Sequence, residues 1–419
     1  MKHFDAQEVR DPVERERALM ARLPEHIAHA KANSAHYAQA LAAVRAEDVI
    51  SRAALAALPV IRKSELAELQ KKNPPFGGLI TTPLTQLGHI YASPGPIYDP
   101  EGRGADPWRF ARALYAAGFR PGDLVHNTFS YHFTPAGMMV EGGAHKLGCC
   151  VFPAGVGQTE MQVTAIADLK PAAYVGTPSF LKIIVEKADE MRADISSLKK
   201  ALVSGEALPA ATRSLLEARG MTLTQCYATA DLGLIAYETS AREGLVLDED
   251  VILEIVRPGT GDPVAAGEVG EVIITTFNAD YPLIRFGTGD LSAVLPGISP
   301  CGRTNTRIKG WLGRADQVTK IRGMFVHPSQ VAQVVKRHAE IKKARLVVDN
   351  PKGDDRMTLH CEVAGSTDES ADLVKLTDLA QAIAASVREV TKLRAEINFC
   401  ATGSLPNDGK VIEDARKLD

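Results

Sequence analysis

Residues 281–329 decide how the rest of this chain is interpreted. They contain three turn-rich motifs: Y-P-L-I-R-F-G-T-G-D (281–290), G-R-A-D (313–316) and I-R-G-M-F-V-H-P-S (321–329). Asp290 follows Gly287 and Gly289, so we expect its carboxylate on a turn where a ligand can approach the backbone closely. A carboxylate in that position can accept two hydrogen bonds from a vicinal diol such as a ribose. Arg314, on the second turn, offers a guanidinium suited to phosphate or carboxylate.

The three motifs, in this order and spacing, resemble the late motifs of adenylate-forming enzymes, and most of all those of the phenylacetate–coenzyme A ligase family. The resemblance also predicts a Gly-Lys pair near the C-terminus, and Gly409-Lys410 supplies it. It implies a two-step ligase. A carboxylic acid, expected to be aryl or arylacetic, reacts with ATP to give acyl-AMP, and coenzyme A then displaces AMP. The implied cofactors and partners are ATP, Mg²⁺, coenzyme A and the small-molecule acid.

Length and composition are those of a soluble globular protein with two or three domains. The chain has 419 residues, of which 45% are hydrophobic and 24% charged, and its formal net charge is −3. This charge favours neither a nucleic-acid partner nor an anionic membrane surface. The first eleven residues have no apolar core for a signal peptide, and no apolar run is long enough to cross a bilayer. We therefore expect a cytoplasmic protein, and we leave open whether it forms a homodimer.

The pattern along the chain predicts an α/β fold with two domains. Residues 1–80 carry helix signals, such as Asp11-Pro12 at a helix start. From residue 106 to residue 227, helix-like and strand-like segments alternate, which predicts a parallel sheet with helices on both faces. The run Leu147–Phe152, which contains Cys149-Cys150, is predicted to form a buried strand.

Two further regions complete the predicted fold. Residues 245–296 have strand periodicity and predict a small β-subdomain. After Asp316, helix and strand patterns mix in a unit of about a hundred residues, which predicts a small α+β domain. We predict a large N-terminal adenylation domain over 1–315, with 1–80 as a helical layer, and a mobile C-terminal domain over 316–419.

Ligands of parallel sheets bind at the carboxyl ends of the strands. Two predicted strands end in segments that resemble nucleotide-binding motifs of the family, Ser204-Gly205-Glu206-Ala207 and Tyr227-Ala228-Thr229-Ala230-Asp231. The resemblance implies that Tyr227 stacks on adenine, that Thr229 contacts a phosphate, and that Asp231 acts in catalysis as a ligand of Mg²⁺. The second motif departs from the family at Ala228, Ala230 and Asp231, where Gly, Thr or Ser, and Glu are usual. The alternative is a buried strand end with a capping aspartate.

The aromatic residues Phe129, Tyr131 and Phe133 surround another predicted strand end. A cluster of this kind is more often part of a core than of a pocket. The resemblance implies the wall of an acyl pocket at this position.

The C-terminal region carries the remaining predicted roles. The resemblance makes Lys410 the lysine of adenylation, whose ammonium would stabilise the charge shared by the carboxylate and the α-phosphate. It places a hinge at Asp316 and a coenzyme A channel at Arg322 and Gly323. The alternative for Lys410 is a solvated lysine near the chain end.

One loop departs clearly from the family pattern. Adenylate-forming enzymes carry a Ser/Thr/Gly-rich loop with a lysine that holds the β- and γ-phosphates, whereas this chain has Ser93-Pro94-Gly95-Pro96 and no lysine. The two prolines lack the N–H groups with which such a loop binds phosphate. Two alternatives to a coenzyme A ligase follow. One is adenylation with transfer to another acceptor, and the other is a nucleotide-binding protein with weakened catalysis.

Overall fold

The computed structural model describes residues 2–93, 96–315, 319–321, 324–350, 355–363, 369–406 and 410–416. Asp316, Arg322 and Gly323 lie outside the described residues, so the hinge and the coenzyme A channel stay predictions. The chain forms two compact units. The first comprises 1–253, 274–286 and 294–311, and the second comprises 254–273, 287–293 and 312–419. The second unit therefore takes in two short segments that lie before residue 316 in the sequence.

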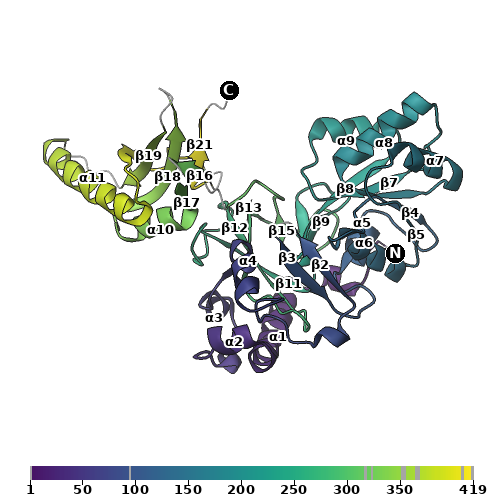
Figure 1. The fold of residues 1–419 in the computed structure, drawn as a ribbon, viewed down its shortest axis with the longest axis horizontal. Helices are drawn as coiled ribbons and strands as arrows, with labels where there is room; N and C mark the ends of the chain where they lie inside the picture. The colour runs from purple at the N-terminus through teal and green to yellow at the C-terminus, as the bar shows by residue number, and fades with distance from the viewer. Residues whose placement is uncertain are drawn as a thin grey trace. The chain divides into compact units, whose positions relative to one another are not determined.

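A nine-stranded sheet forms the centre of the first unit (Figure 1). Its strands, in spatial order, are β14 (Val294–Leu295), β15 (Arg307–Ile308), β10 (Leu245–Leu247), β9 (Gly233–Glu238), β8 (Thr222–Thr229), β7 (Lys200–Val203), β6 (Ala173–Gly176), β4 (Leu124–Asn127) and β5 (Cys150–Pro153). Neighbouring strands run parallel from β8 to β5, and the pairing becomes antiparallel from β8 to β14. The parallel sheet predicted from the alternating pattern is confirmed.

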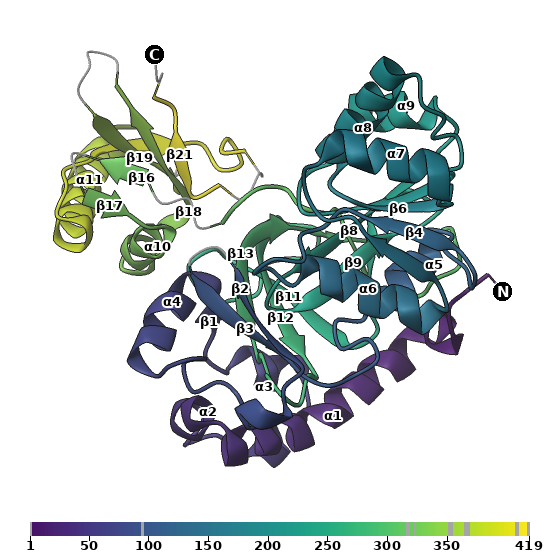
Figure 2. The same ribbon diagram turned by 45° about the vertical axis from the view of Figure 1, so that its right-hand side comes forward.

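Helices cover both faces of the parallel part of this sheet, as Figure 2 shows. They are α5 (Phe110–Ala116), α6 (Ala136–Leu147), α7 (Thr159–Leu169), α8 (Pro178–Met191) and α9 (Ala210–Glu217). Buried residues of α5 and α6 form one core with strand residues such as Val125 and Val175. Buried residues of α7, α8 and α9 form another with Tyr174 and Ala201. Tyr174 and Val175 are consecutive strand residues and so face opposite sides of the sheet.

One part of the sheet prediction was wrong. Cys149 is buried, but Cys150 is exposed because it opens β5, which lies beside β4 at the edge of the described sheet. An apolar run does not distinguish an edge strand from a central one.

The start of the chain is mainly helical. Residues 1–80 contain η1 (Ala6–Val9), α1 (Pro12–Asn33), α2 (Ala35–Ala40), η2 (Ala46–Asp48), α3 (Arg52–Ala56) and α4 (Lys63–Lys72), and η3 (Leu84–Gln86) follows. Asp11 caps α1 by accepting hydrogen bonds from the backbone N–H groups of Val13 and Glu14, as its sequence context predicted. None of the described helices combines the length and the apolar character that crossing a membrane requires.

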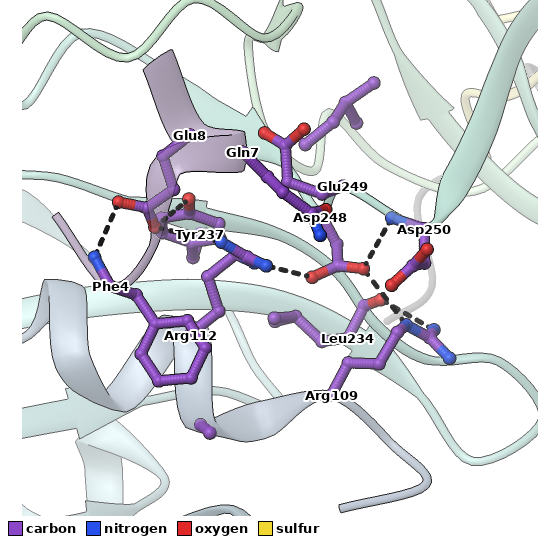
Figure 3. A network of polar contacts seen from close by, with 12 residues as sticks. Phe4, Gln7, Glu8, Arg109, Arg112, Leu234, Tyr237, Asp248, Glu249 and Asp250 are labelled. Atoms are coloured by element: carbon purple, nitrogen blue, oxygen red, sulfur yellow. Dashed lines mark hydrogen bonds and ion pairs between the residues drawn. The ribbon is translucent and has the colours of Figure 1, made fainter. Parts of the chain in front are cut away.

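A network of buried charges fixes the first residues against the sheet (Figure 3). Glu8, which is fully buried, accepts hydrogen bonds from the Tyr237 hydroxyl at 3.0 Å and from Phe4 N, and it pairs with Arg303 at 3.0 Å. Arg112 pairs with Asp5 at 2.9 Å and with Asp248 at 3.4 Å. Buried charges are tolerated only when they are paired in this way.

Two smaller sheets complete the β-structure outside the C-terminal part of the chain. The strands β2 (His89–Ser93) and β3 (Ile97–Glu101) form an antiparallel hairpin in which Ser93 pairs directly with Ile97. A second sheet has the order β1 (Ile61–Arg62), β13 (Phe286–Ser292), β12 (Gly270–Thr276) and β11 (Val251–Val256).

The C-terminal part of the second unit is the predicted α+β fold. Its mixed sheet has the order β20 (Glu396–Cys400), β19 (Arg356–Val363), β18 (Ile341–Asp349) and β21 (Ile412–Asp414). The helices α10 (Pro328–Lys336) and α11 (Glu369–Thr391) contribute Val331, Val334, Ile383 and Val387 to its core. A short hairpin of β16 (Thr319–Ile321) and β17 (Met324–Val326) precedes α10.

Candidate active site

The two segments with nucleotide-binding character lie next to each other. Because β7 and β8 are adjacent and parallel, their carboxyl ends meet at one edge of the sheet. The Ser204 hydroxyl, directly after β7, donates to Cys226 O on β8 at 2.9 Å. Ser204–Ala207 and Tyr227–Asp231 are therefore neighbours, as the strand pattern predicted.

Gly205 brings the loop close to an aromatic residue. Its φ of +85° lies in the left-handed region that glycine adopts without strain. A Cβ at this position would lie 3.6 Å from Thr177 and 3.7 Å from Phe129, which places the ends of β4, β6 and β7 together. Glu206 is exposed and accepts a hydrogen bond from Ser179 N in the first turn of α8 at 2.7 Å. Ala207 is also exposed, which leaves this strip of backbone open to a ligand.

The Tyr227 motif spans the change from parallel to antiparallel pairing. Tyr227 is buried at 9% exposure, and the ladder to β9 shifts register between Tyr227 and Ala228. The Thr229 hydroxyl accepts a hydrogen bond from Leu232 N at 3.1 Å, which closes the turn that carries Asp231. The roles proposed for Tyr227 and Thr229 toward a nucleotide stay predictions.

Asp231 forms an ion pair with a residue that the sequence did not suggest. Its Oδ2 lies 2.6 Å from Nζ of Lys63, the first residue of α4. The Asp231 side chain is fully buried and that of Lys63 is 23% exposed. Within the part of the chain that the structure describes, Oδ1 of Asp231 has no hydrogen-bond partner.

A second carboxyl group lies against Asp231. Asp99, on β3, is fully buried and faces the Asp231 carboxylate. Burial, followed by the charge of Asp231, raises the pKa of Asp99 well above its ordinary value. The Ser93 hydroxyl lies nearby but donates to Ile97 O at 3.4 Å. Tyr281, buried at 1% exposure, lies close enough to both aspartates for their charges to raise the pKa of its hydroxyl, although burial raises it most.

The predicted acyl-pocket residues lie in different environments. Phe129 is half-buried and packs against the core of the sheet. The Tyr131 hydroxyl accepts from Asn127 Nδ2 and donates to Glu141 Oε2, each at 2.8 Å. Phe133 is 81% exposed, with a left-handed φ of +61°. The structure brings Phe129 to the nucleotide loops through Gly205, while an acyl-pocket role for Tyr131 and Phe133 stays a prediction.

The second unit holds the remaining predicted site residues. Asp290 near the end of β13 and Arg314 form a β-bridge, and their side chains form an ion pair with 3.0 Å between Oδ1 and Nη1. Asp290 is buried at 7% exposure, whereas the Arg314 side chain is 43% exposed. Asp290 and Arg314, which the sequence analysis considered separately, thus form an ion pair.

Lys410 is exposed and lies two residues before β21. It lines a cavity of about 610 Å³ within the second unit, together with Lys336, Lys342 and Lys343. A cluster of ammonium groups there suits an anionic ligand. The adenylation role of Lys410 stays a prediction.

Comparison with known proteins identifies the family of the chain. Residues 108–278 match the model of the AMP-binding enzyme family, and residues 323–416 match that of the AMP-binding enzyme C-terminal domain. The phenylacetate–coenzyme A ligase of Aromatoleum evansii is 30% identical over 403 residues, which are 92% of this chain and 90% of that protein. The chain belongs to the phenylacetate–coenzyme A ligase family. The enzyme of the same name from Thermus thermophilus is 32% identical, over 73% of this chain and 72% of its own length.

Solved structures agree with this family assignment. A 2-hydroxyisobutyryl-CoA ligase bound to 2-HIB-AMP and CoA in its thioesterification state superposes with a TM-score of 0.70 at 26% identity, over 98% of this chain and 92% of that one. The same enzyme in its postadenylation state with 2-HIB-AMP superposes with a TM-score of 0.72 at 25% identity, over 99% and 92% of the two chains. The chain described here is accordingly an AMP-forming acid–coenzyme A ligase that uses ATP and coenzyme A.

Reasoning from the sequence missed Lys63, Asp99 and Tyr281. Lys63 and Asp231 are 168 positions apart, and no motif connects them. The sequence did contain a signal for Asp99. It is an acidic residue in the short strand β3, directly after the loop 93–96 that differs from the family pattern. A polar residue in a short strand beside a ligand loop is a candidate for that ligand's site.

The charged groups around Asp231 fit a divalent cation in part. No group of three or more His, Cys, Asp or Glu side chains able to hold a metal ion occurs among the described residues. Mg²⁺, however, is commonly held by one or two carboxylates together with substrate phosphates. The unpartnered Oδ1 of Asp231 meets that requirement, and a cation there would neutralise phosphate charge on the nucleotide. The ammonium of Lys63 already compensates the other oxygen.

Proposed function

We propose that this chain joins an aromatic or arylacetic acid to coenzyme A in two steps. The carboxylate oxygen attacks the α-phosphorus of ATP, and pyrophosphate leaves. The thiol sulfur of coenzyme A then attacks the acyl carbon, and AMP leaves with the carboxyl oxygen while the thiol loses its proton. The observation that carries the proposal is the 30% identity to a phenylacetate–coenzyme A ligase across 92% of the chain.

The geometry supports a nucleotide at the ends of β7 and β8. The exposed backbone of Gly205–Ala207 lies next to the Tyr227 motif, and we assign adenine to this place. We assign the ribose to Asp290, whose carboxylate is oriented by Arg314, and the stabilisation of negative charge in the first step to Lys410.

Phe129 favours an aromatic acid over a small aliphatic one. It lies directly behind Gly205, so an acyl group attached to the nucleotide would meet its ring. Aromatic side chains pair favourably with aromatic ligands. Short 2-hydroxy acids are the second candidate class, because solved structures similar to this chain come from an enzyme named for 2-hydroxyisobutyrate.

A substrate screen tests the proposal. Pyrophosphate release is measured with ATP and Mg²⁺ over phenylacetate, benzoate, indoleacetate and 2-hydroxyisobutyrate, each with and without coenzyme A. Mass spectrometry then identifies the acyl product. We expect an aryl or arylacetic thioester that forms only with coenzyme A. Pyrophosphate release without any thioester would indicate a different acceptor, and no release with any acid would contradict the proposed ligase activity.

A further inference from the structure

A thiol, an imidazole and an amide lie together on the C-terminal sheet, where the proposed function assigns no role to any of them. Cys400 and Asn398 lie on β20, and His360 lies opposite Asn398 on the adjacent strand β19. The sulfur of Cys400 lies 3.9 Å from Nδ1 of His360. The amide nitrogen of Asn398 lies 2.9 Å from the same Nδ1 and 4.0 Å from the sulfur. The three side chains therefore form one cluster on one face of the sheet.

The hydrogen bonds of the cluster give each group a chemical role. The amide nitrogen of Asn398 is a donor, so Nδ1 of His360 is the acceptor, and the proton of the neutral ring is on Nε2. A ring nitrogen in that state can take the proton of a thiol. A base next to a nucleophile, oriented by a third group, is the usual arrangement around an activated nucleophile. Cys400 has this environment.

The cluster is open to small molecules, whereas the other face of the sheet is closed. Cys400 and His360 are half-buried, and Asn398 is exposed. Leu359 and Cys361, the neighbours of His360 on β19, face the other way into the core with α10 and α11. Burial raises the pKa of the Cys361 thiol to about 12, so this neighbouring thiol is inert. Reactive cysteines are partly exposed and lie beside a base or a cation, as Cys400 does.

We propose that Cys400 is a base-activated thiol that forms a mixed disulfide with disulfides of low-molecular-weight thiols. Nδ1 of His360 takes the proton from Sγ of Cys400, and the thiolate attacks one sulfur of the disulfide. A new S–S bond forms, the old S–S bond breaks, and the departing thiolate takes the proton from the imidazolium. The products are the Cys400 mixed disulfide and one free thiol, so the disulfide itself is the oxidant.

The thiol lies next to a buried carboxylate that holds the following loop. Cys400 pairs in register with Glu362, so both side chains lie on the same face of the sheet. Glu362 is 3% exposed and accepts a hydrogen bond from Leu405 N at 2.7 Å. The loop 401–406 leads from β20 toward Lys410 in the sequence. An adduct on Cys400 adds bulk beside Glu362, and we expect it to disturb this loop and to slow the step assigned to Lys410. This consequence rests on the proposed function, whereas the modification does not.

Treatment of the full-length protein with glutathione disulfide at neutral pH tests the site, and mass spectrometry of its peptides gives the rate at each thiol. Cys150 is the internal reference, because it is exposed and the residue opposite it is Leu124 rather than a base. We expect Cys400 to be modified about tenfold or more faster than Cys150, since a positioned base accelerates proton removal. His360→Gln should remove that advantage and leave the rate at Cys150 unchanged.

Added imidazole separates a base from a structural residue. In His360→Ala, free imidazole should restore the rate at Cys400 by about threefold or more, which a purely structural role would not allow. Asn398→Ala, at an exposed position, should slow Cys400 without replacement of the ring. The buried Cys361 reports on folding of each variant, because it reacts only when the sheet opens. Rates at Cys400 and Cys150 within twofold of each other in the wild type would overturn the proposal, as would an unchanged rate at Cys400 in both His360→Gln and Asn398→Ala.

Pyrophosphate release before and after treatment tests the consequence for Lys410. The modified wild type should lose about tenfold or more in adenylation, because small displacements of a catalytic group are costly, and dithiothreitol should restore the rate. Cys400→Ser should adenylate normally and be insensitive to the disulfide. Undiminished adenylation in protein that carries the adduct would refute control of the loop by Cys400. The modification rates need neither acid nor ATP, so failure of the acid screen and failure of this proposal are distinguishable.

Discussion

At the scale of single residues, the chain supports its predicted nucleotide site with charge pairs that the sequence does not display. Asp290 was predicted as a ribose ligand and Arg314 as an anion ligand, and the structure pairs them at 3.0 Å. An aspartate oriented by a guanidinium keeps one oxygen in a fixed direction. Arg314 would then act on the nucleotide both directly and through Asp290.

Replacement of Asp290 by alanine should weaken AMP and ATP binding to the same extent. One charge-assisted contact to the ribose contributes about 1.5–3 kcal/mol, which corresponds to about a tenfold to hundredfold loss. Isothermal calorimetry measures the dissociation constant for AMP. The control is Asp262→Ala, which removes an exposed carboxylate of the same unit. Unchanged AMP affinity in a folded Asp290→Ala protein would exclude the ribose role.

His26 gives acid sensitivity to the helical layer. The His26 side chain lies on α1 and the residue is 8% exposed. Its ring packs edge to face against that of Phe277, with 5.4 Å between the ring centroids. Burial lowers the pKa of His26 to about 4. The unfolded chain, with a histidine pKa near 6.5, then binds more protons than the folded chain between these two values. This contribution to stability is therefore fully present above pH 6.5 and is lost as the pH falls through 4.

Urea unfolding at pH 7.5 and at pH 4.5 checks this prediction. The histidine alone should lower the free energy of unfolding by about 2–3 kcal/mol between the two pH values. His26→Gln should remove that part of the pH dependence, although it also loses packing at both pH values. His132→Gln, at an exposed position, is the control. Equal pH dependence of wild type and His26→Gln would contradict the assignment.

At the scale of elements, the β2–β3 hairpin contains the loop 93–96, whose sequence differs from the phosphate-binding loop of the family. Ser93 pairs with Ile97, so the strands are joined by three residues, of which two are proline. Such a connection offers few backbone N–H groups, whereas binding of phosphate by a loop depends on several. The hairpin therefore lies where the family resemblance implies a loop that binds the β- and γ-phosphates.

We therefore expect ATP to bind little more tightly than AMP. Calorimetry with AMP and a non-hydrolysable ATP analogue, both without metal, gives the two dissociation constants, and their ratio should stay within about threefold because the β- and γ-phosphates gain few contacts. Ser93→Ala should leave the ratio unchanged. A strong preference for the ATP analogue that disappears in Ser93→Ala would show that the loop still binds these phosphates.

At the scale of the whole molecule, the sequence predicted most elements but not their long-range contacts. The alternation from residue 106 to residue 227 indicated the parallel sheet because helix and strand periodicities are local properties. The edge position of Cys150 and the pair between Lys63 and Asp231 depend on which strands and helices become neighbours. Local pattern does not contain that information. The compact units also differ from the predicted limits, because residues 254–273 and 287–293 cluster with the C-terminal part.

The adenylation role proposed for Lys410 leads to a prediction for the two half-reactions. Adenylation brings an anionic carboxylate to an anionic phosphate, and a cation relieves that repulsion, whereas the thioester step starts from an activated acyl group. Lys410→Ala should slow adenylation by about 10²–10³-fold, by analogy with the loss of one oxyanion donor. The variant should still convert supplied acyl-AMP and coenzyme A to thioester.

Both half-reactions are measured with the acid that the screen identifies. Arg388→Ala removes an exposed cation on α11, away from the cavity that Lys410 lines, and should affect neither step strongly. Replacement of Gly323 by a bulky residue should impair the thioester step alone. Equal losses of Lys410→Ala in both half-reactions would refute the separation of roles.

The buried ion pair between Glu8 and Arg303 joins two residues that are made far apart in time during synthesis. Glu8 leaves the ribosome among the first residues, but its partner Arg303 is made 295 residues later, which at the usual elongation rate takes roughly 15–60 s. Until then a carboxylate destined for full burial lacks one of its compensating charges. We therefore expect the first turn of the chain to attach only after Arg303 has been made, and the start of the protein to be among the last parts of the first unit to reach the native arrangement.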